Sequence, residues 1–166
     1  PLVSAVAPVP PTLSLAVPPM SELLAVTTPT MPVLPSAHVT APTAAAGPVG
    51  AHGYCMSGPY ALAAAARFPD RVRAAASFYG TWLVSDAEES PHLNLGKITG
   101  EIYISCAEHD DLAPPDMVAE LRRLFDASGV AGELEIQPDV HHGFAFPGRW
   151  CYDQPAAERH WERLIS

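Results

Sequence analysis

Positive charge is scarce in this chain. Only nine Lys and Arg side chains stand against 18 Asp and Glu, which gives a formal net charge of −9 at pH 7. A protein that binds nucleic acid neutralises phosphates with clustered cations, and a strongly acidic chain cannot supply them. From its composition we therefore expect no nucleic-acid partner.

Cysteine is scarce as well. The three cysteines, Cys55, Cys106 and Cys151, cannot all pair with one another, and none lies at the Cys-x-x-Cys spacing of a metal or redox site. Free thiols are typical of reducing compartments, so we expect a cytoplasmic protein.

Uninterrupted apolar runs are missing too. Residues 1–50 are rich in apolar side chains, but prolines break them well before the roughly 20 residues that span a bilayer. No Lys or Arg precedes an apolar stretch in the manner of a secretory signal. We therefore expect a soluble protein with no membrane partner.

Residues 1–47 differ in composition from the rest of the chain. Glu22 is their only carboxylate, they hold no Lys or Arg, and they contain many prolines, each of which fixes one dihedral and removes a donor. This pattern predicts an irregular, polyproline-like segment and a domain boundary near Pro48. The abrupt change suggests a truncated or out-of-frame replacement of another segment, which translation of the other two reading frames would test.

After Pro48 the pattern alternates between strand-like and helix-like segments. Short apolar or alternating stretches predict strands over residues 49–54, 74–79, 101–107 and 132–137. Helical patterns separate or follow them over residues 59–68, 115–127 and 154–165, and in the second of these Met117, Leu121 and Leu124 fall on one face. This order predicts an α/β fold with a parallel sheet, right-handed crossovers and flanking helices.

The segment Gly53 to Gly58, GYCMSG, places Cys55 between small residues where a predicted strand meets a predicted helix. Small residues allow the sharp strand-to-helix turn that lifts the middle side chain out of the sheet, as in a nucleophile elbow. Asp110 and His142 each follow a later predicted strand. Because reactive loops gather at the carboxyl ends of parallel strands, we expect these three side chains to meet at one edge of the sheet.

Five motifs from Pro48 to Ser166 together resemble the dienelactone hydrolase family, whose members are α/β-hydrolases that open enol-lactones with a cysteine nucleophile. The motifs are GYCMSG at 53–58, FYG at 78–80, SPHL at 90–93, AEHDDLAPP at 107–115 and HHGFAFP at 141–147. The chain order of thiol, acid and histidine is also that of α/β-hydrolases. The resemblance implies an α/β-hydrolase-like domain over residues 48–166 that is incomplete at its N-terminal side.

The resemblance also implies a role for each of the three side chains. Cys55 becomes the nucleophile, His142 the base and Asp110 the residue that orients the histidine. Asp111 and His141 are the neighbours most easily confused with them. Asp110 is preferred because it lies four residues before Pro114, and His142 because Gly143 and Phe144 follow it directly.

Further site residues are expected around this triad. The backbone N–H of Met56 is expected to hold the oxyanion, while Tyr54, Phe144 and Arg149 are candidates for substrate contact, with core packing as the alternative for the two aromatic rings. No metal or organic cofactor is expected.

The chain departs from the family at three places. Ser57 stands where the family's turn usually has glycine, and Phe146 where many members have an arginine. Residues 1–47 match nothing in the family's N-terminal strands, which normally supply part of the sheet and one oxyanion-hole donor.

The predicted function is hydrolysis of a lactone or small carboxylic ester through a Cys-His-Asp triad. The alternative is a truncated, non-catalytic remnant or binding module of the same fold. The sequence predicts neither the substrate nor the oligomeric state.

Overall fold

A computed structural model describes residues 47–166 of the chain. The elements, in order, are β1 (Val49–Tyr54), the 3-10 turn η1 (Cys55–Ser57), α2 (Gly58–Arg67), β2 (Val72–Phe78), the 3-10 segment η2 (Pro91–Lys97), β3 (Glu101–His109), α3 (Pro115–Ser128), β4 (Gly132–His141) and α4 (Gln154–Ile165). The irregular segment predicted over residues 1–47 lies outside the described residues, apart from Gly47.

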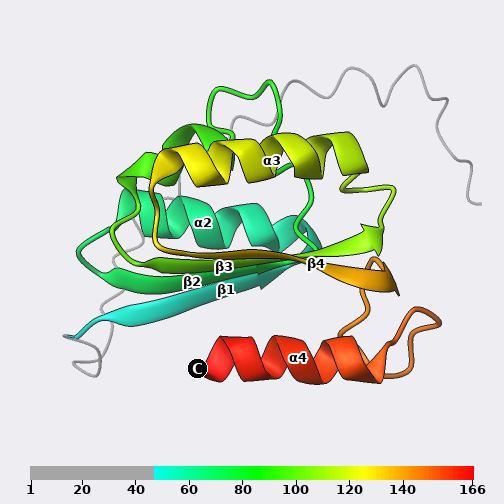
Figure 1. The fold of residues 1–166 in the computed structure, drawn as a ribbon. Helices are drawn as coiled ribbons and strands as arrows, with labels where there is room; N and C mark the ends of the chain where they lie inside the picture. The colour runs from blue at the N-terminus through cyan, green and yellow to red at the C-terminus, as the bar shows by residue number, and fades with distance from the viewer. Residues whose placement is uncertain (1–46) are drawn as a thin grey trace, which may run out of the picture. The chain divides into compact units, whose positions relative to one another are not determined.

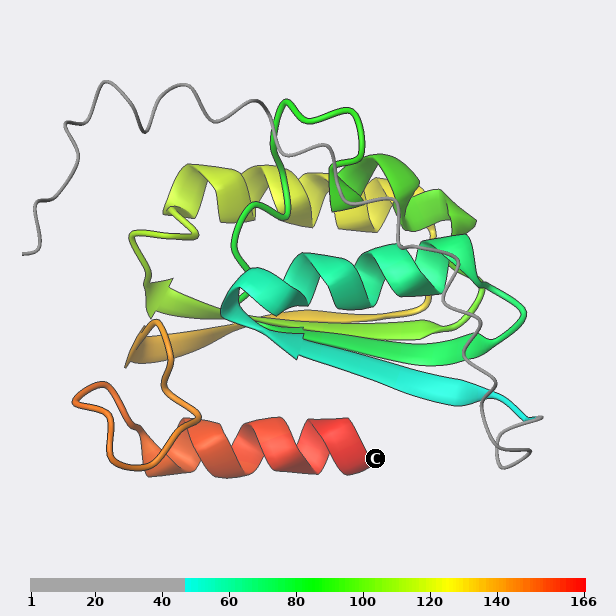
Figure 2. The same ribbon diagram turned by 180° about the vertical axis from the view of Figure 1, so that it is seen from behind.

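The described strands form one parallel sheet in the order β1-β2-β3-β4. Helices α2 and α3 cover one face, and α4 lies against the other (Figure 1). Seen from behind, β1 forms the near edge of the sheet (Figure 2). The predicted α/β architecture of parallel strands and flanking helices is confirmed.

Strand β3 shows how the sequence builds two cores. Successive side chains of a strand point to opposite faces. Ile102, Ile104 and Cys106 accordingly join the apolar cluster that includes residues of α2 and α3. Tyr103 and Ala107 join a second cluster that includes a residue of α4. The near-continuous apolar run of β3 is what a strand covered on both faces requires.

Helix α3 begins at Pro115, whose missing N–H costs nothing in a first turn, and is followed by Gly129 in the left-handed conformation, a common helix stop. Leu121 is completely buried, and Met117 and Leu124 pack against the same cluster, so the predicted apolar face of this helix is confirmed. Within residues 47–166 no helix has the length and apolar character needed to cross a membrane.

Two strands run further than their patterns predict. β3 continues to His109 and β4 to His141, rather than ending at residues 107 and 137. A register shift between Ala107 and His109, together with Pro138 in β4, hides the continuation, because both break the regular alternation. β4 has a neighbour on one side only among the described strands, and an edge strand tolerates proline.

The remaining differences are smaller. β2 spans residues 72–78 rather than 74–79, and α2 spans 58–67 rather than 59–68. The 3-10 segment η2 was not predicted, because its sequence PHLNLGK has no clear period.

Candidate active site

Three of the predicted site residues come directly after strand ends. Cys55 follows β1, Asp110 follows β3, and His142 follows β4. The three strands are parallel members of one sheet, so their carboxyl ends lie at the same edge. This topology gathers residues that are far apart in the sequence.

The turn at Cys55 has a strained backbone. Cys55 has a φ of 54°, in the left-handed region that non-glycine residues rarely occupy and that costs on the order of 1–3 kcal/mol. Gly53 makes the turn possible, because a Cβ at that position would lie 2.1 Å from the carbonyl oxygen of Ser57. Such strain persists only where the surrounding structure holds it, and it is common at functional sites.

Ser57, at the position where the resemblance leads us to expect glycine, supports the turn. Its hydroxyl accepts a hydrogen bond from the N–H of Tyr54 at 2.8 Å and donates one to the carbonyl oxygen of Tyr54 at 2.7 Å. The N–H of Thr81 donates to the carbonyl of Cys55 at 3.3 Å from the other side. The serine therefore closes the turn locally.

Asp110 and His142 form a direct hydrogen bond. Nδ1 of His142 lies 2.7 Å from Oδ2 of Asp110, whose side chain is completely buried. The other carboxylate oxygen, Oδ1, accepts from the N–H of Leu112 at 2.9 Å. Because the ionised carboxylate only accepts, Nδ1 carries the proton and the neutral ring keeps its lone pair on Nε2. Asp110 is thus held in place and selects one tautomer of the histidine.

The electrostatics of His142 follow from these contacts. The hydrogen bond that His142 donates to Asp110 is the largest influence and raises the pKa of His142, while burial opposes it and the Cys55 side chain adds a smaller raising effect. Nε2 is buried and makes no hydrogen bond of ordinary geometry within the described residues. The thiol is therefore near enough to influence the ring, although no hydrogen bond of ordinary geometry joins the two groups within the described residues. Catalytic hydrogen bonds are often long or misaligned before substrate binds.

Asp110 and His142 also differ from their sequence neighbours Asp111 and His141 in burial and in contacts. Asp111 is exposed, whereas Asp110 is buried against the histidine. His141 is exposed, and its ring lies 5.0 Å from that of Trp150, away from the Asp110 bond.

The predicted substrate-contact residues lie in different surroundings. The hydroxyl of Tyr54 is hydrogen-bonded to Nε2 of His160 at 2.8 Å. Phe144 is completely buried. Arg149 is exposed and its guanidinium lies next to Gly143, so it is near the histidine. Met56 is 61 % exposed at the start of the helical turn, and the role of its N–H stays a prediction.

Tyr79 lies against His142, a contact that the sequence did not predict. Its ring lies 5.0 Å from the His142 ring in an edge-to-face contact, and its φ of 39° is again in the left-handed region. Its hydroxyl is buried without a hydrogen-bond partner among the described residues, and burial raises the pKa of Tyr79. The FYG motif at 78–80 was the available signal, but the sequence alone assigned no catalytic role to this ring.

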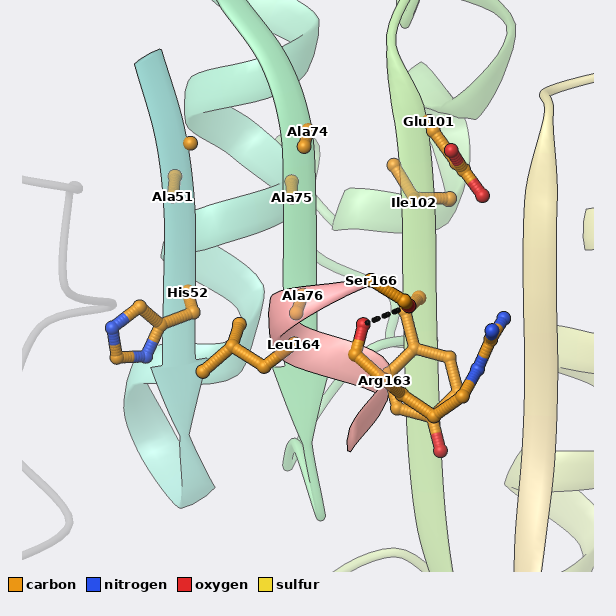
Figure 3. A pocket seen from close by; sticks show the side chains of 12 residues that line it. Ala51, His52, Ala74, Ala75, Ala76, Glu101, Ile102, Arg163, Leu164 and Ser166 are labelled. Carbon is orange, nitrogen blue, oxygen red and sulfur yellow. Dashed lines mark hydrogen bonds between the residues drawn. The ribbon is translucent and has the colours of Figure 1, made fainter. Parts of the chain in front are cut away.

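A pocket of about 340 Å³ opens elsewhere, where the C-terminal end of α4 faces the sheet (Figure 3). Its lining includes His52, Ala76, Arg163 and Leu164, and it takes residues from the amino-terminal parts of the strands. The thiol, carboxylate and imidazole described above are not among its lining residues. This pocket is therefore separate from the candidate active site.

Known proteins resemble this chain over about 70% of its length. A protein of Aquifex aeolicus named as a candidate carboxymethylenebutenolidase is 29% identical over 119 residues, and the protein usf of Aquifex pyrophilus is 27% identical over 121 residues. Each match covers 71% of this chain and 49% of the relative. A solved structure from Klebsiella pneumoniae, named for dienelactone hydrolase, superposes with a TM-score of 0.62 at 23% identity, covering 69% of this chain and 48% of the other. The chain thus spans about half the length of the relatives that it matches.

A family model gives the broadest match. The model described as "Dienelactone hydrolase family" matches residues 34–166. The match begins ahead of Pro48, where the sequence predicts a boundary, and it includes Cys55, Asp110 and His142. By this match, and by a fold shared with solved members, the chain belongs to the dienelactone hydrolase family.

Proposed function

We propose that this chain carries the chemistry of a hydrolase that opens a lactone or a small carboxylic ester through Cys55, His142 and Asp110. The observation that supports it best is the 2.7 Å hydrogen bond from His142 Nδ1 to the buried carboxylate of Asp110. That bond leaves Nε2 with a lone pair and no hydrogen bond of its own, beside the thiol. A base oriented in this way can take the proton of a nucleophile.

The reaction begins when Nε2 of His142 accepts the thiol proton of Cys55. The thiolate attacks the carbonyl carbon, and the carbonyl electrons move to the oxygen, where the N–H of Met56 is a candidate donor. As the carbonyl re-forms, the carbon–oxygen bond to the leaving alcohol breaks and His142 returns its proton to that oxygen. In a lactone this alcohol stays tethered to the acyl group.

The second half of the reaction releases the acid. His142 takes a proton from water, and the resulting hydroxide attacks the thioester carbon. The carbon–sulfur bond then breaks, and the proton passes from His142 to the departing thiolate. Asp110 stabilises the imidazolium that forms in both halves without itself taking the proton.

Substrate recognition is a second part of the proposal. Arg149 offers an exposed cation near Gly143, which suits a substrate that carries a carboxylate. Besides the N–H of Met56, an oxyanion hole needs a second donor, and losing one such donor costs about 10² to 10³ in turnover.

Two measurements on the same samples test the proposal. The first is hydrolysis of an activated ester such as 4-nitrophenyl acetate, and the second is the rate of alkylation of each thiol by iodoacetamide, followed by mass spectrometry. We expect Cys55 to react much faster than Cys106 and Cys151, both buried, because burial also raises the pKa of Cys106 to about 12.

The matched variants are Cys55→Ala and Cys106→Ala. The first should abolish turnover, whereas the second removes a thiol of the core and should leave turnover in place. Equal turnover in the Cys55→Ala protein and the unchanged protein would refute the proposal.

A non-catalytic role is the second candidate. Within residues 47–166, β1 pairs with β2 and has no strand on its other side, and an uncovered edge favours association with other chains. If this hypothesis holds, Cys55 should be alkylated no faster than free cysteine and the protein should show no ester turnover. It should also self-associate in analytical ultracentrifugation. A folded monomer with turnover that depends on Cys55 would eliminate it.

We also propose a cytoplasmic location. The three cysteines are unpaired, which suits a reducing compartment. Cell fractionation, with a secreted and a cytoplasmic marker protein as references, tests this directly.

A further inference from the structure

We infer that His160 of α4 is a positioning residue which, by holding Tyr54, sets how the Cys55 turn lies relative to the His142 loop. This inference rests on the proposed function, because it assigns a role in bringing the thiol and the imidazole together. It concerns a histidine that the mechanism does not use. His160 belongs to α4, and this helix lies on the opposite face of the sheet from α2 (Figure 1).

The hydrogen bonds of His160 define its protonation. Nδ1 lies 2.6 Å from the carbonyl oxygen of Ala157 in the same helix. A carbonyl only accepts, so Nδ1 must carry the proton. In the neutral ring Nε2 is then an acceptor, and it accepts a hydrogen bond from the hydroxyl of Tyr54 at 2.8 Å. The direction of both hydrogen bonds is therefore determined.

Burial keeps this arrangement in place. His160 is 1 % exposed, and burial lowers its pKa, so the ring is neutral at neutral pH. Its ring lies 4.7 Å from that of Phe78 in an edge-to-face contact and 4.4 Å from that of Trp161. A buried polar side chain with both nitrogens bonded is rigid, because breaking either bond leaves an unsatisfied group.

Tyr54 connects three parts of the site. Its backbone N–H and carbonyl are both bonded to Ser57, so it belongs to the turn that presents Cys55. Its ring stacks on Phe78 at 5.1 Å and contacts Phe146, in the loop after His142, at 5.2 Å. Its hydroxyl is bonded to α4. A change in the position of this ring therefore acts on the nucleophile turn and on the histidine loop together.

The size of the effect follows from the geometry that catalysis needs. A misplacement of about 1 Å can cost on the order of 100-fold in rate. The Tyr54–His160 bond involves none of the reacting groups Cys55, His142 and Asp110, so its loss should lower kcat more than it changes KM. It should also slow the alkylation of Cys55, because that rate depends on the surroundings of the thiol and needs no ester substrate.

The test compares four variants of the full chain. His160→Phe and Tyr54→Phe each remove one side of the bond, and we expect each to lower kcat by about 10-fold to 100-fold. His160→Gln retains an acceptor and should recover most of that loss. Glu162→Gln, at a side chain that is 71 % exposed on the same helix, is the matched control and should keep full activity.

Two further readouts separate positioning from general damage. The double variant Tyr54→Phe with His160→Phe should lose no more than either single variant, since both remove the same bond. In the unchanged protein, ¹⁵N chemical shifts of His160 should show a neutral ring with its proton on Nδ1. Should His160→Phe not fold, Tyr54→Phe carries the test alone, with circular dichroism to verify its fold.

The outcomes for this inference and for the proposed function are distinct. If the unchanged protein hydrolyses ester through Cys55 but folded Tyr54→Phe and His160→Phe proteins keep full kcat and full alkylation rate, the positioning role is overturned and the proposed function stands. If the unchanged protein shows neither turnover nor rapid alkylation of Cys55, the proposed function fails and the positioning role fails with it.

Discussion

Replacing Asp110 by asparagine is the sharpest perturbation of this site. The substitution keeps the size of the side chain and an oxygen that can accept from the N–H of Leu112, as Oδ1 does now. It removes the negative charge and turns an NH₂ group, a donor, towards Nδ1 of His142. The ring must then offer Nδ1 as the acceptor and carry its proton on Nε2, so the nitrogen beside Cys55 loses its lone pair.

The expected loss is large. A histidine held in the wrong tautomer by the equivalent substitution in a serine protease loses about 10⁴ in kcat, which corresponds to about 5 kcal/mol of transition-state stabilisation. We expect a comparable factor for Asp110→Asn, because Asp110 is completely buried and its bond to His142 is only 2.7 Å long. The control is Asp111→Asn, which changes the same residue type at an exposed neighbouring position and should have little effect.

A titration of His142 by NMR tests the same reasoning without turnover. The hydrogen bond to Asp110 is the largest cause of the raised pKa, and burial opposes it, so Asp110→Asn should lower the pKa of His142. A pKa raised in the folded state stabilises the protein below the ordinary value of 6.5, and that stability is lost as the pH rises through the raised value. The free energy of unfolding should therefore differ most between the unchanged protein and the variant below about pH 6.5.

The result that would refute this reasoning is specific. It is an Asp110→Asn protein whose His142 pKa and ester turnover both match those of Asp111→Asn. Such a result would mean that the carboxylate of Asp110 neither orients the ring of His142 nor raises its pKa.

The remaining predictions concern stability and use urea unfolding. Gly58→Ala should destabilise by about 1–3 kcal/mol, because its Cβ would lie 2.3 Å from the hydroxyl oxygen of Ser77; Gly96→Ala, where a Cβ meets nothing within 4 Å, is the control, and an equal loss in both would contradict the packing argument. Leu121→Ala should cost about 2–5 kcal/mol, since Leu121 is completely buried. Leu112→Ala, at a side chain 52 % exposed, should cost far less, and similar midpoints for the two variants would count against the described core.

Much of the fold was readable because its signals are local. Helix α4 was predicted with the bounds that it has, since its amphipathic pattern and the start at Gln154 are both in the sequence. Strand β4 was cut short at residue 137, because Pro138 and Asp139, which has a φ of 60°, interrupt the alternation. Pairing with β3 carries the strand past that break, and pairing is not a local property.

The order of a thiol, an acid and a histidine, each directly after a strand, was set by the sequence alone, as was the sharp turn implied by the small residues around Cys55. The sequence favoured Asp110 over Asp111, and the tertiary structure shows that Asp110 is hydrogen-bonded to His142. Only the tertiary structure decided that His160 reaches Tyr54 across 106 positions of the chain. The reason is physical. Period and composition record what neighbours along the chain prefer, whereas the direction of a side chain at a strand end and its partner in space depend on register and on helix packing against the sheet.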